Sequence, residues 1–320
     1  MRGLLPWIAA LLVAAVAGAG AVLVLGATLF GASGFVRIYL DAVVRGDAAS
    51  AIALPGVDLG DADPRLVVDD ALHLDEYRVT GEADGGDGIR LVTVAWSAGD
   101  ETGETEFAVE RVGTRFGLFP EWGFARSPVE TLDLAVLHDP RFRVNGTEAD
   151  TGLDSGAPRP YALLVPGAYR FDHDSAYLSA DPVTVLAERP GARVDATVDV
   201  QAAPELLAQI QTEVDDHLDG CATQQVLFPT GCPFGYAIAD RVASTPSWEI
   251  VQHPALEVRA ADEFERWEVP AADAVARLTV DVQSLFDGSV EPREQDVAFE
   301  VRYLVEIVGE HTLRIVAQYD

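Results

Sequence analysis

The sequence predicts an α+β fold in which an N-terminal transmembrane helix precedes two rolls, each a helix packed on an antiparallel sheet, and the rolls flank a small β-sandwich. Three features predict it: a long uncharged stretch near the start, a helical apolar pattern that opens two later segments, and strand-like alternation elsewhere. A chain of 320 residues is long enough for two or three domains beside a membrane segment. The expected boundaries are 1–33 for the anchor, 34–127 for the first roll, 128–202 for the sandwich and 203–320 for the second roll.

An uncharged run of 27 residues, Leu4–Phe30, is the predicted anchor. About 20 apolar residues span the hydrocarbon layer as a helix, and Trp7 lies near one end, where aromatic rings favour the interface. A cleaved signal peptide is the alternative, with an apolar region of about 7–15 residues and a small-residue cleavage site after it. Here the small triplet at 17–19 falls inside the run. This favours an uncleaved single-pass helix in the cell membrane, with its N-terminus in the cytoplasm.

Cys221 and Cys232 are the two cysteines of the chain, with ten residues between them. This spacing matches neither a CxxC redox pair nor half of a zinc ribbon, and the nearest histidine, His217, supplies only one further ligand. The sequence therefore favours a disulfide over two unpaired thiols. Disulfides persist in oxidising compartments, so we expect the C-terminal domains to be extracytoplasmic.

The first roll, 34–127, opens with apolar residues at helical spacing, namely Phe35, Ile38, Tyr39, Ala42 and Val43. Gly46 is suited to end this helix, and Asp47 to cap a short second one. Three alternating segments, 73–83, 88–98 and 103–113, then predict antiparallel strands joined by the turn sequences DGGDG and GDETG. A shorter strand closes the roll near Trp122.

Residues 128–202 consist of short strand-like runs bounded by Gly and Pro, and an Asn145-Gly146 pair is typical of a hairpin turn. This pattern predicts the sandwich. The second roll, 203–320, opens on Pro204 with an amphipathic helix and continues into strands, including a separate short strand near Trp267.

The charge balance bears on the partners of the protein. The chain has 22 Arg and no Lys against 52 Asp plus Glu, a formal net charge of −30. Nucleic acids and anionic lipid surfaces attract Lys and Arg, so we expect no nucleic-acid partner. The acidity is explained by solubility, with a cationic partner or adaptation to high salt as alternatives.

Enzyme motifs are absent from the sequence: there is no HExxH, no GxSxG, no GxxxxGKS and no GxGxxG opening a helix. We therefore predict a non-enzymatic protein with no catalytic residues, no cofactor and no metal site. The densest polar cluster, FDHDS at 171–175, would place Asp172 and Asp174 on one face of a strand and His173 on the other. The sequence favours an exposed turn over a cation site there.

Rolls of the predicted type often enclose an apolar cavity between helix and sheet. Tyr39, Tyr77, Trp96 and Phe107 are the candidate lining residues. With such a pocket, the membrane-proximal roll would be a sensor or carrier of a small apolar ligand. The same side chains are also expected in an ordinary core.

Short motifs give the chain a resemblance to bacterial membrane proteins. VRIYLDAVVRGDAASAIAL, at 36–54, resembles the opening helix of nuclear-transport-factor-2-like or cystatin-like domains beside membrane anchors in Gram-positive bacteria. LVPGAYRF, at 164–171, resembles a core strand of small sandwich domains in the same proteins, and CATQQVLFPTGCPFG, at 221–235, is similar to a segment of uncharacterised actinobacterial membrane proteins. The overall order resembles the teicoplanin-resistance-associated membrane protein family.

That family commonly begins with a cytoplasmic zinc ribbon, whereas only three residues precede the predicted span, so we expect no signalling through such a ribbon. Anchor, disulfide and resemblance together predict a membrane-anchored, extracytoplasmic, non-enzymatic binding or scaffolding protein of the bacterial cell envelope. Its partners would be the membrane, through residues 4–30, and an envelope protein or the cell wall.

Overall fold

The computed structural model describes residues 31–115, 119–309 and 311–318, with 52% of them in strands and 15% in helices. The predicted α+β class is therefore wrong: the protein is mostly β, and its sheets form a sandwich-like arrangement instead of two helix-and-sheet rolls around a sandwich. The prediction treated each opening helix as a full layer of its roll. In the structure far more residues lie in strands than in helices, and two strands near the C-terminus alone span 18 and 20 residues.

The predicted transmembrane anchor, Leu4–Phe30, lies outside the described residues. Among the residues that are described, no helix has both the length and the hydrophobicity needed to cross a membrane. The anchor therefore stays a prediction.

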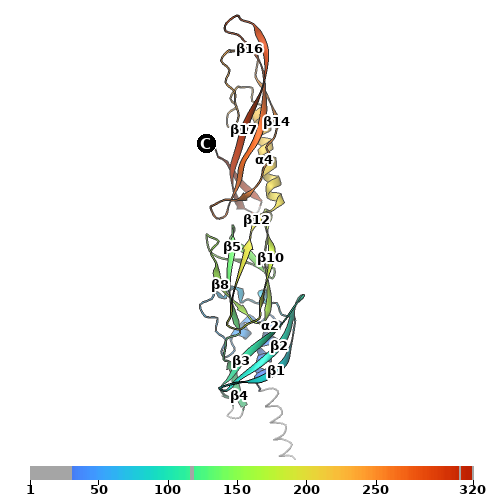
Figure 1. Ribbon diagram of the computed structural model, residues 1–320, viewed down its shortest axis with the longest axis vertical. Helices are drawn as coiled ribbons and strands as arrows, with labels where there is room; N and C mark the ends of the chain where they lie inside the picture. Colours follow the sequence, from blue (N-terminus) through green and yellow to red (C-terminus); the bar gives the residue numbers. More distant parts are fainter. Residues whose placement is uncertain (1–30, 116–118, 310, 319–320) are drawn as a thin grey trace, which may run out of the picture.

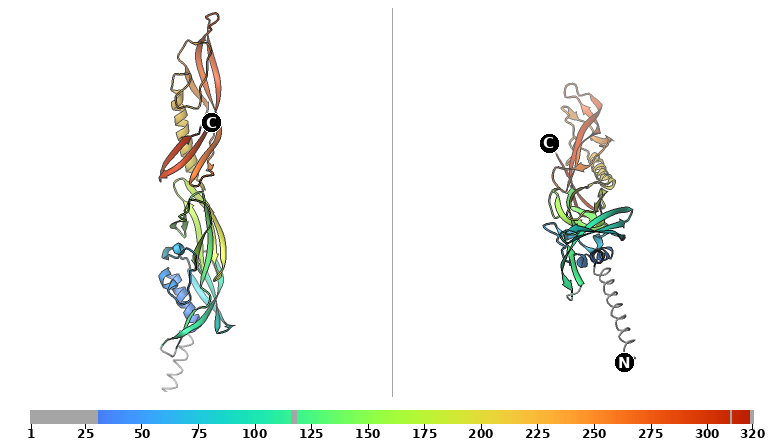
Figure 2. Two further views of the ribbon diagram at one scale, coloured as in Figure 1. Left: turned by 90° about the vertical axis from the view of Figure 1, so that its left-hand side faces the viewer. Right: turned by 60° about the horizontal axis from the view of Figure 1, so that its bottom comes forward.

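The molecule is long and narrow, with three parts stacked along its long axis (Figure 1, Figure 2). We call residues 31–127 the N-terminal unit, 128–202 the middle unit and 203–318 the distal unit. The N-terminal unit lies at one pole of the molecule. The turn of a long hairpin of the distal unit lies at the other.

The N-terminal unit packs one face of a helix against a four-stranded antiparallel sheet. Its elements are α2 (Ala32–Val44), α3 (Ala48–Ile52), the short 3₁₀ turns Pro64–Leu66 and Asp69–Ala71, β1 (Glu76–Gly86), β2 (Ile89–Ala98), β3 (Glu101–Arg115) and β4 (Phe119–Phe124), with the strands in sequential order. Val36 and Leu40 on α2 are fully buried. As predicted, Gly46 follows α2 with a φ of 66°, and Asp47 caps α3 by accepting a hydrogen bond from the Ser50 N–H at 2.9 Å.

The middle unit contains two sheets. Its strands are β5 (Val129–Leu137), β6 (Arg141–Val144), β7 (Thr147–Asp150), β8 (Arg159–Leu164), β9 (Gly167–Asp174), β10 (Leu178–Ala187), β11 (Arg193–Asp199) and β12 (Gln201–Ala202). One sheet has the order β11-β5-β8, with β11 parallel to β5, and the other the order β12-β10-β9-β6-β7. The strands of this unit thus divide between two separate sheets.

The predicted Asn145-Gly146 turn joins β6 to β7, and both residues have a positive φ, 48° and 85°. The Asn145 side-chain amide donates hydrogen bonds to the carbonyl oxygens of Ala71, at 2.8 Å, and Ala168, at 3.0 Å. Its Oδ1 accepts one from the Arg170 N–H at 2.8 Å. One turn residue therefore also ties the N-terminal unit to the middle unit.

The distal unit combines one long helix with a sheet built around a long hairpin. Its elements are α4 (Pro204–Ala222), β13 (Arg241–Val242), β14 (Ser247–Gln252), β15 (Arg259–Ala260), β16 (Arg266–Gln283), β17 (Val290–Gly309) and β18 (Thr312–Ala317). The separate short strand predicted near Trp267 is instead the start of β16. Pro270 has no N–H to donate, but it lies where the register shifts between Val269 and Ala272, so the strand passes through it.

Two clusters of buried apolar side chains form the core. One fills most of the N-terminal unit and the adjoining end of the middle unit. The other includes Leu66 and Ala71 of the N-terminal unit and runs through the middle unit into the distal unit. Trp267 belongs to the second cluster, and its ring lies 6.2 Å from that of His138 in an edge-on arrangement. The middle and distal units therefore share one core.

Asp63 ties the segment before β1 to the middle unit. Its backbone N–H donates to the Pro160 carbonyl at 2.8 Å, and its carbonyl accepts from the Ala162 N–H at 3.0 Å. Its carboxylate accepts hydrogen bonds from Nε of Arg65, at 3.0 Å, and of Arg159, at 2.8 Å. Burial disfavours the charged carboxylate, but the hydrogen bond from the Arg65 backbone N–H, at 3.0 Å, and those from the two guanidinium groups outweigh that effect and lower the pKa of Asp63.

Replacing Asp63 by asparagine is expected to lower the free energy of unfolding at neutral pH by about 1–2 kcal/mol. Hydrogen bonds to a charged group contribute about 1.5–3 kcal/mol, and here both arginines are partly in solvent. Because the folded-state pKa of Asp63 is lowered, its contribution is complete above the unfolded pKa, about 3.9, and is lost as the pH falls through the folded pKa. Urea unfolding at neutral pH and near pH 3 measures both effects.

Asp296→Asn is the matched control for this prediction, because Asp296 forms an exposed pair with Arg277. The control should be as stable as the wild type at neutral pH. Equal losses in the two variants would contradict the role of Asp63 as a link between the units.

Candidate functional site

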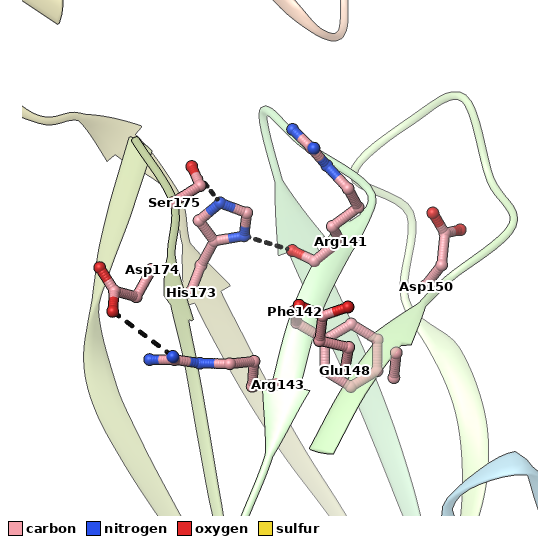
Figure 3. A pocket seen from close by; sticks show the side chains of 9 residues that line it. Arg141, Phe142, Arg143, Glu148, Asp150, His173, Asp174 and Ser175 are labelled. Carbon is pink, nitrogen blue, oxygen red and sulfur yellow. Dashed lines mark hydrogen bonds and ion pairs between the residues drawn. The ribbon is translucent and has the colours of Figure 1, made fainter. Parts of the chain in front are cut away.

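An open groove in the middle unit, with a volume of about 430 Å³, is the candidate site (Figure 3). It lies on strands β6, β7 and β9 and the turn that follows β9. Its lining residues are Arg141, Phe142, Arg143, Glu148, Ala149, Asp150, His173, Asp174 and Ser175. In β6 the sequence RFRV alternates, so that Phe142 and Val144 are buried while the two arginines share the opposite face.

Ion pairs cross the strands of this groove. The Arg143 Nε donates to Asp172 Oδ1 at 2.7 Å, and an Arg143 terminal nitrogen lies 3.4 Å from Asp174 Oδ2. Arg141 forms a forked pair with Asp139, with hydrogen bonds of 2.9 and 2.7 Å. Forked pairs fix the direction of a guanidinium group as well as its charge. The groove therefore presents arginines whose orientation is already set.

The segment FDHDS is not the exposed turn that the sequence favoured. Asp172 and His173 are only 8% and 6% exposed and lie in β9. The predicted alternation does hold, because Asp172 and Asp174 both contact Arg143. These carboxylates form ion pairs with the Arg143 guanidinium group. Among the described residues, no group of three or more His, Cys, Asp or Glu side chains could hold a metal ion.

His173 forms two hydrogen bonds at the rim of the groove (Figure 3). A carbonyl can only accept, so Nδ1–H of His173 donates to the Arg141 carbonyl at 2.9 Å, and Nε2 lies 3.1 Å from the Ser175 hydroxyl. Ser175 Oγ also lies 3.2 Å from both the N–H and the carbonyl of Leu178. A histidine beside a serine can activate a nucleophile, but here the hydroxyl of this serine also bonds to Leu178 and helps to close the turn between β9 and β10.

The charges of the groove shift one another's pKa values. The hydrogen bond to Asp172 raises the pKa of Arg143, and the one to Asp139 raises that of Arg141. Glu265 of the distal unit interacts with the same charges: burial and then the Asp139 carboxylate raise its pKa, while Arg141 lowers it. The two arginines therefore stay charged at every relevant pH, and each is paired with a carboxylate.

The four predicted lining residues of the N-terminal unit form two pairs. Tyr39 and Phe107 are fully buried with ring centroids 6.0 Å apart, and the ring of Phe124 lies 5.1 Å from that of Tyr39. Tyr77 and Trp96 are partners across β1 and β2 and border a wide, open depression. The structure thus brings Tyr39 and Phe107 together inside the unit and Tyr77 and Trp96 together at its sheet.

The polar atoms of three of these residues bond within the protein. Tyr39 Oη donates to the Val165 carbonyl at 2.8 Å, and burial raises its pKa. Trp96 Nε1 donates to Thr105 Oγ1 at 3.1 Å. Tyr77 Oη donates to Asp41 Oδ1 at 2.5 Å, and burial followed by this bond raises its pKa to about 12. A role of the four in ligand binding stays a prediction.

The predicted disulfide between Cys221 and Cys232 is confirmed. Cys221 lies in the last turn of α4 and is 2% exposed, and an irregular loop brings the chain back to Cys232, whose Cα lies 5.8 Å from that of Cys221. The Gln224 side chain braces that loop, accepting from the Thr230 N–H at 2.8 Å and donating to its carbonyl at 3.2 Å. Gly231, with a φ of 74°, turns the chain before Cys232.

No family model matches the chain, and neither a curated protein nor a solved structure matches it. The resemblance to the teicoplanin-resistance-associated family therefore stays a prediction.

Neither arginine of the groove was predicted from the sequence. The alternation of Arg141 and Arg143 with apolar residues could have placed them on one face of a strand. The partner of Arg141 is Asp139, only two residues away. The partners of Arg143, however, come from β9, 29 and 31 residues further along the chain, and no local pattern specifies that pairing.

Proposed function

We propose that the protein is a membrane-anchored, extracytoplasmic, non-enzymatic binding or scaffolding protein of a bacterial cell envelope. One observation carries the proposal: three β-rich units are stacked in a row that starts with the N-terminal unit at one pole and ends in a hairpin turn at the other (Figure 1). A chain anchored through residues 4–30 would hold its distal unit away from the membrane. Such an extended stack suits a protein that reaches a partner.

Two further observations support the proposal. The disulfide of the distal unit suits an oxidising compartment outside the cytoplasm. The groove of the middle unit has its arginines paired with carboxylates, and the chain has a net charge of −30. A surface of this kind recognises polar or cationic partners by charge complementarity.

Fractionation of an actinobacterial host that expresses the full chain with a C-terminal epitope tests the proposal. The protein is expected in the membrane pellet after alkaline carbonate extraction, and its epitope should be digested when protease is added to intact protoplasts. A maleimide–polyethylene glycol reagent should add to Cys221 and Cys232 only after reduction. A chain without residues 1–30 is the matched control and should leave the membrane pellet.

Either of two results would overturn the proposal. One is recovery of the full chain in the soluble fraction. The other is protection of the epitope from external protease, together with labelling of the thiols without reduction.

A further inference from the structure

The turn between β16 and β17 presents large apolar side chains to solvent. We call residues 284–290 the distal tip, because they lie at the pole of the molecule opposite the N-terminal unit (Figure 1, Figure 2). Phe286 is 99% exposed, its neighbour Leu285 is 73% exposed, and Val290 is 56% exposed. Single exposed apolar residues are ordinary, but adjacent ones on a protruding turn are typical of contact sites.

The distal tip does not need these side chains to keep its shape. The Ser284 N–H donates to the Ser289 carbonyl at 2.9 Å, and the Gly288 N–H donates to the Ser284 carbonyl at 3.1 Å. Ser284 Oγ accepts from the Phe286 N–H at 3.2 Å, and Asp287 Oδ1 accepts from the Ser289 N–H at 3.1 Å. A turn closed by its own polar groups is organised before binding, which reduces the entropy lost when a partner docks.

Acidic side chains outnumber basic ones around the distal tip. The acidic residues are Asp240, Asp287, Glu291 and Glu294, and the basic ones are Arg241 and Arg293. Asp240 belongs to this group in space, because its carboxylate accepts a hydrogen bond from the Leu285 N–H at 3.4 Å. Anionic lipid would repel this surface, and so would a second copy of a chain whose net charge is −30. The complementary partner is an apolar pocket with arginine or lysine at its rim.

We propose that the distal tip is a docking element: Phe286 and Leu285 insert into an apolar pocket, rimmed by cationic residues, on a second protein of the cell envelope. The inference deepens the proposed function, on which it rests for the location of the partner. The aromatic ring supplies the buried anchor of the contact, and the surrounding carboxylates pair with the cationic rim. The groove of the middle unit is not required for it.

Photo-crosslinking from position 286 of the full-length protein, in cells that make it, tests the inference. Phe286→benzoylphenylalanine is expected to form an adduct with one protein, and mass spectrometry should map that adduct to an apolar pocket flanked by Arg or Lys. The control carries the same photoreactive residue in place of Val112, which is 51% exposed in the N-terminal unit. It should not label that pocket.

The crosslinked protein is then purified, and its affinity for the full chain is measured in detergent. Phe286→Ser is expected to weaken binding about 30-fold or more, as removal of a central aromatic anchor does. The thermal midpoint should not change, because the ring of Phe286 is in solvent. Val112→Ser should leave the affinity unchanged. Glu291→Gln combined with Glu294→Gln should weaken binding several-fold at low salt and reduce its salt dependence.

Several results would overturn the inference: an adduct only with lipid, an adduct with a second copy of this chain, an adduct with a protein surface that has no such pocket, or no adduct. The outcome is separable from that of the proposed function. A chain found in the membrane fraction without the adduct refutes the docking element alone. A soluble chain that still docks through Phe286 refutes the anchor alone.

Discussion

Replacing Trp267 by alanine is expected to lower the free energy of unfolding of the middle and distal units by about 3–5 kcal/mol, the range for a buried tryptophan cut back to alanine. Trp267 is 1% exposed. It lies at the start of β16, opposite Val305 of β17 and Ala260 of β15, and its ring meets that of His138 in the middle unit. A cavity at this point would remove apolar contacts from both units.

The loss should also uncouple the two units. They share one core, and the Glu265 N–H donates to the His138 carbonyl at 3.1 Å beside the tryptophan. In the wild type we expect both units to unfold in a single transition, whereas Trp267→Ala should separate it into two. Urea unfolding followed by circular dichroism, compared with tryptophan fluorescence, measures the separation.

Two control variants test whether the effect of Trp267→Ala comes from the loss of a buried aromatic ring. Trp267→Phe keeps an aromatic ring in the core and should cost less than half as much. Phe286→Ala removes a similar number of atoms from a side chain in solvent and should leave the unfolding curve unchanged. If Trp267→Ala retained a single transition with wild-type stability, the continuous core between the units would be refuted.

Local features of the fold were predictable from the sequence because a few neighbouring residues determine them. Gly46 and Asp47 end one helix and cap the next through the backbone freedom of one and the short side chain of the other. The pair Asn145-Gly146 forms a hairpin turn because both residues tolerate a positive φ. The disulfide between Cys221 and Cys232 followed from a spacing that suits neither a CxxC redox pair nor a zinc ribbon.

Features that depend on distant pairings were not predictable in this way. The fold class was wrong because the length of a strand is set by its partner: β16 continues through Pro270 since β17 pairs with it on both sides of the bulge. The groove of the middle unit likewise depends on the position of β9 beside β6, which brings Asp172 to Arg143. The ion pair between these two strands therefore could not be predicted from the sequence.

The distal tip is an intermediate case. The Asp287-Gly288 pair indicates a turn, and Leu285 and Phe286 stand directly before it. The sequence does not tell whether such apolar residues fold back onto a sheet or project into solvent. In the structure both side chains project into solvent, because a hydrogen bond between Ser284 and Ser289 closes the turn tightly.

Removing the disulfide, by changing both Cys221 and Cys232 to alanine, is expected to lower the free energy of unfolding of the distal unit by about 3 kcal/mol, the chain-entropy estimate for a loop of this length. The loop it closes supports a buried cluster, because Trp248 Nε1 donates to the Val226 carbonyl at 2.8 Å and the Trp248 ring lies 5.0 Å from that of Phe234. Trp248 therefore provides a fluorescence signal close to the change.

The wild type treated with a reductant should lose as much stability as the double variant, and the reductant should have no effect on the double variant itself. Gln224→Ala, which removes the two hydrogen bonds of this side chain to Thr230 but keeps the disulfide, should cost about 1–2 kcal/mol, because a typical hydrogen bond contributes about 1 kcal/mol. Because the middle unit shares its core with the distal unit, part of the loss should also appear there, and the effect on the N-terminal unit, whose cluster reaches only the far end of the middle unit, should be the smallest. Equal stability of the oxidised and reduced wild type would show that the loop is held by its packing and hydrogen bonds, and that the disulfide does not contribute to the stability of the distal unit.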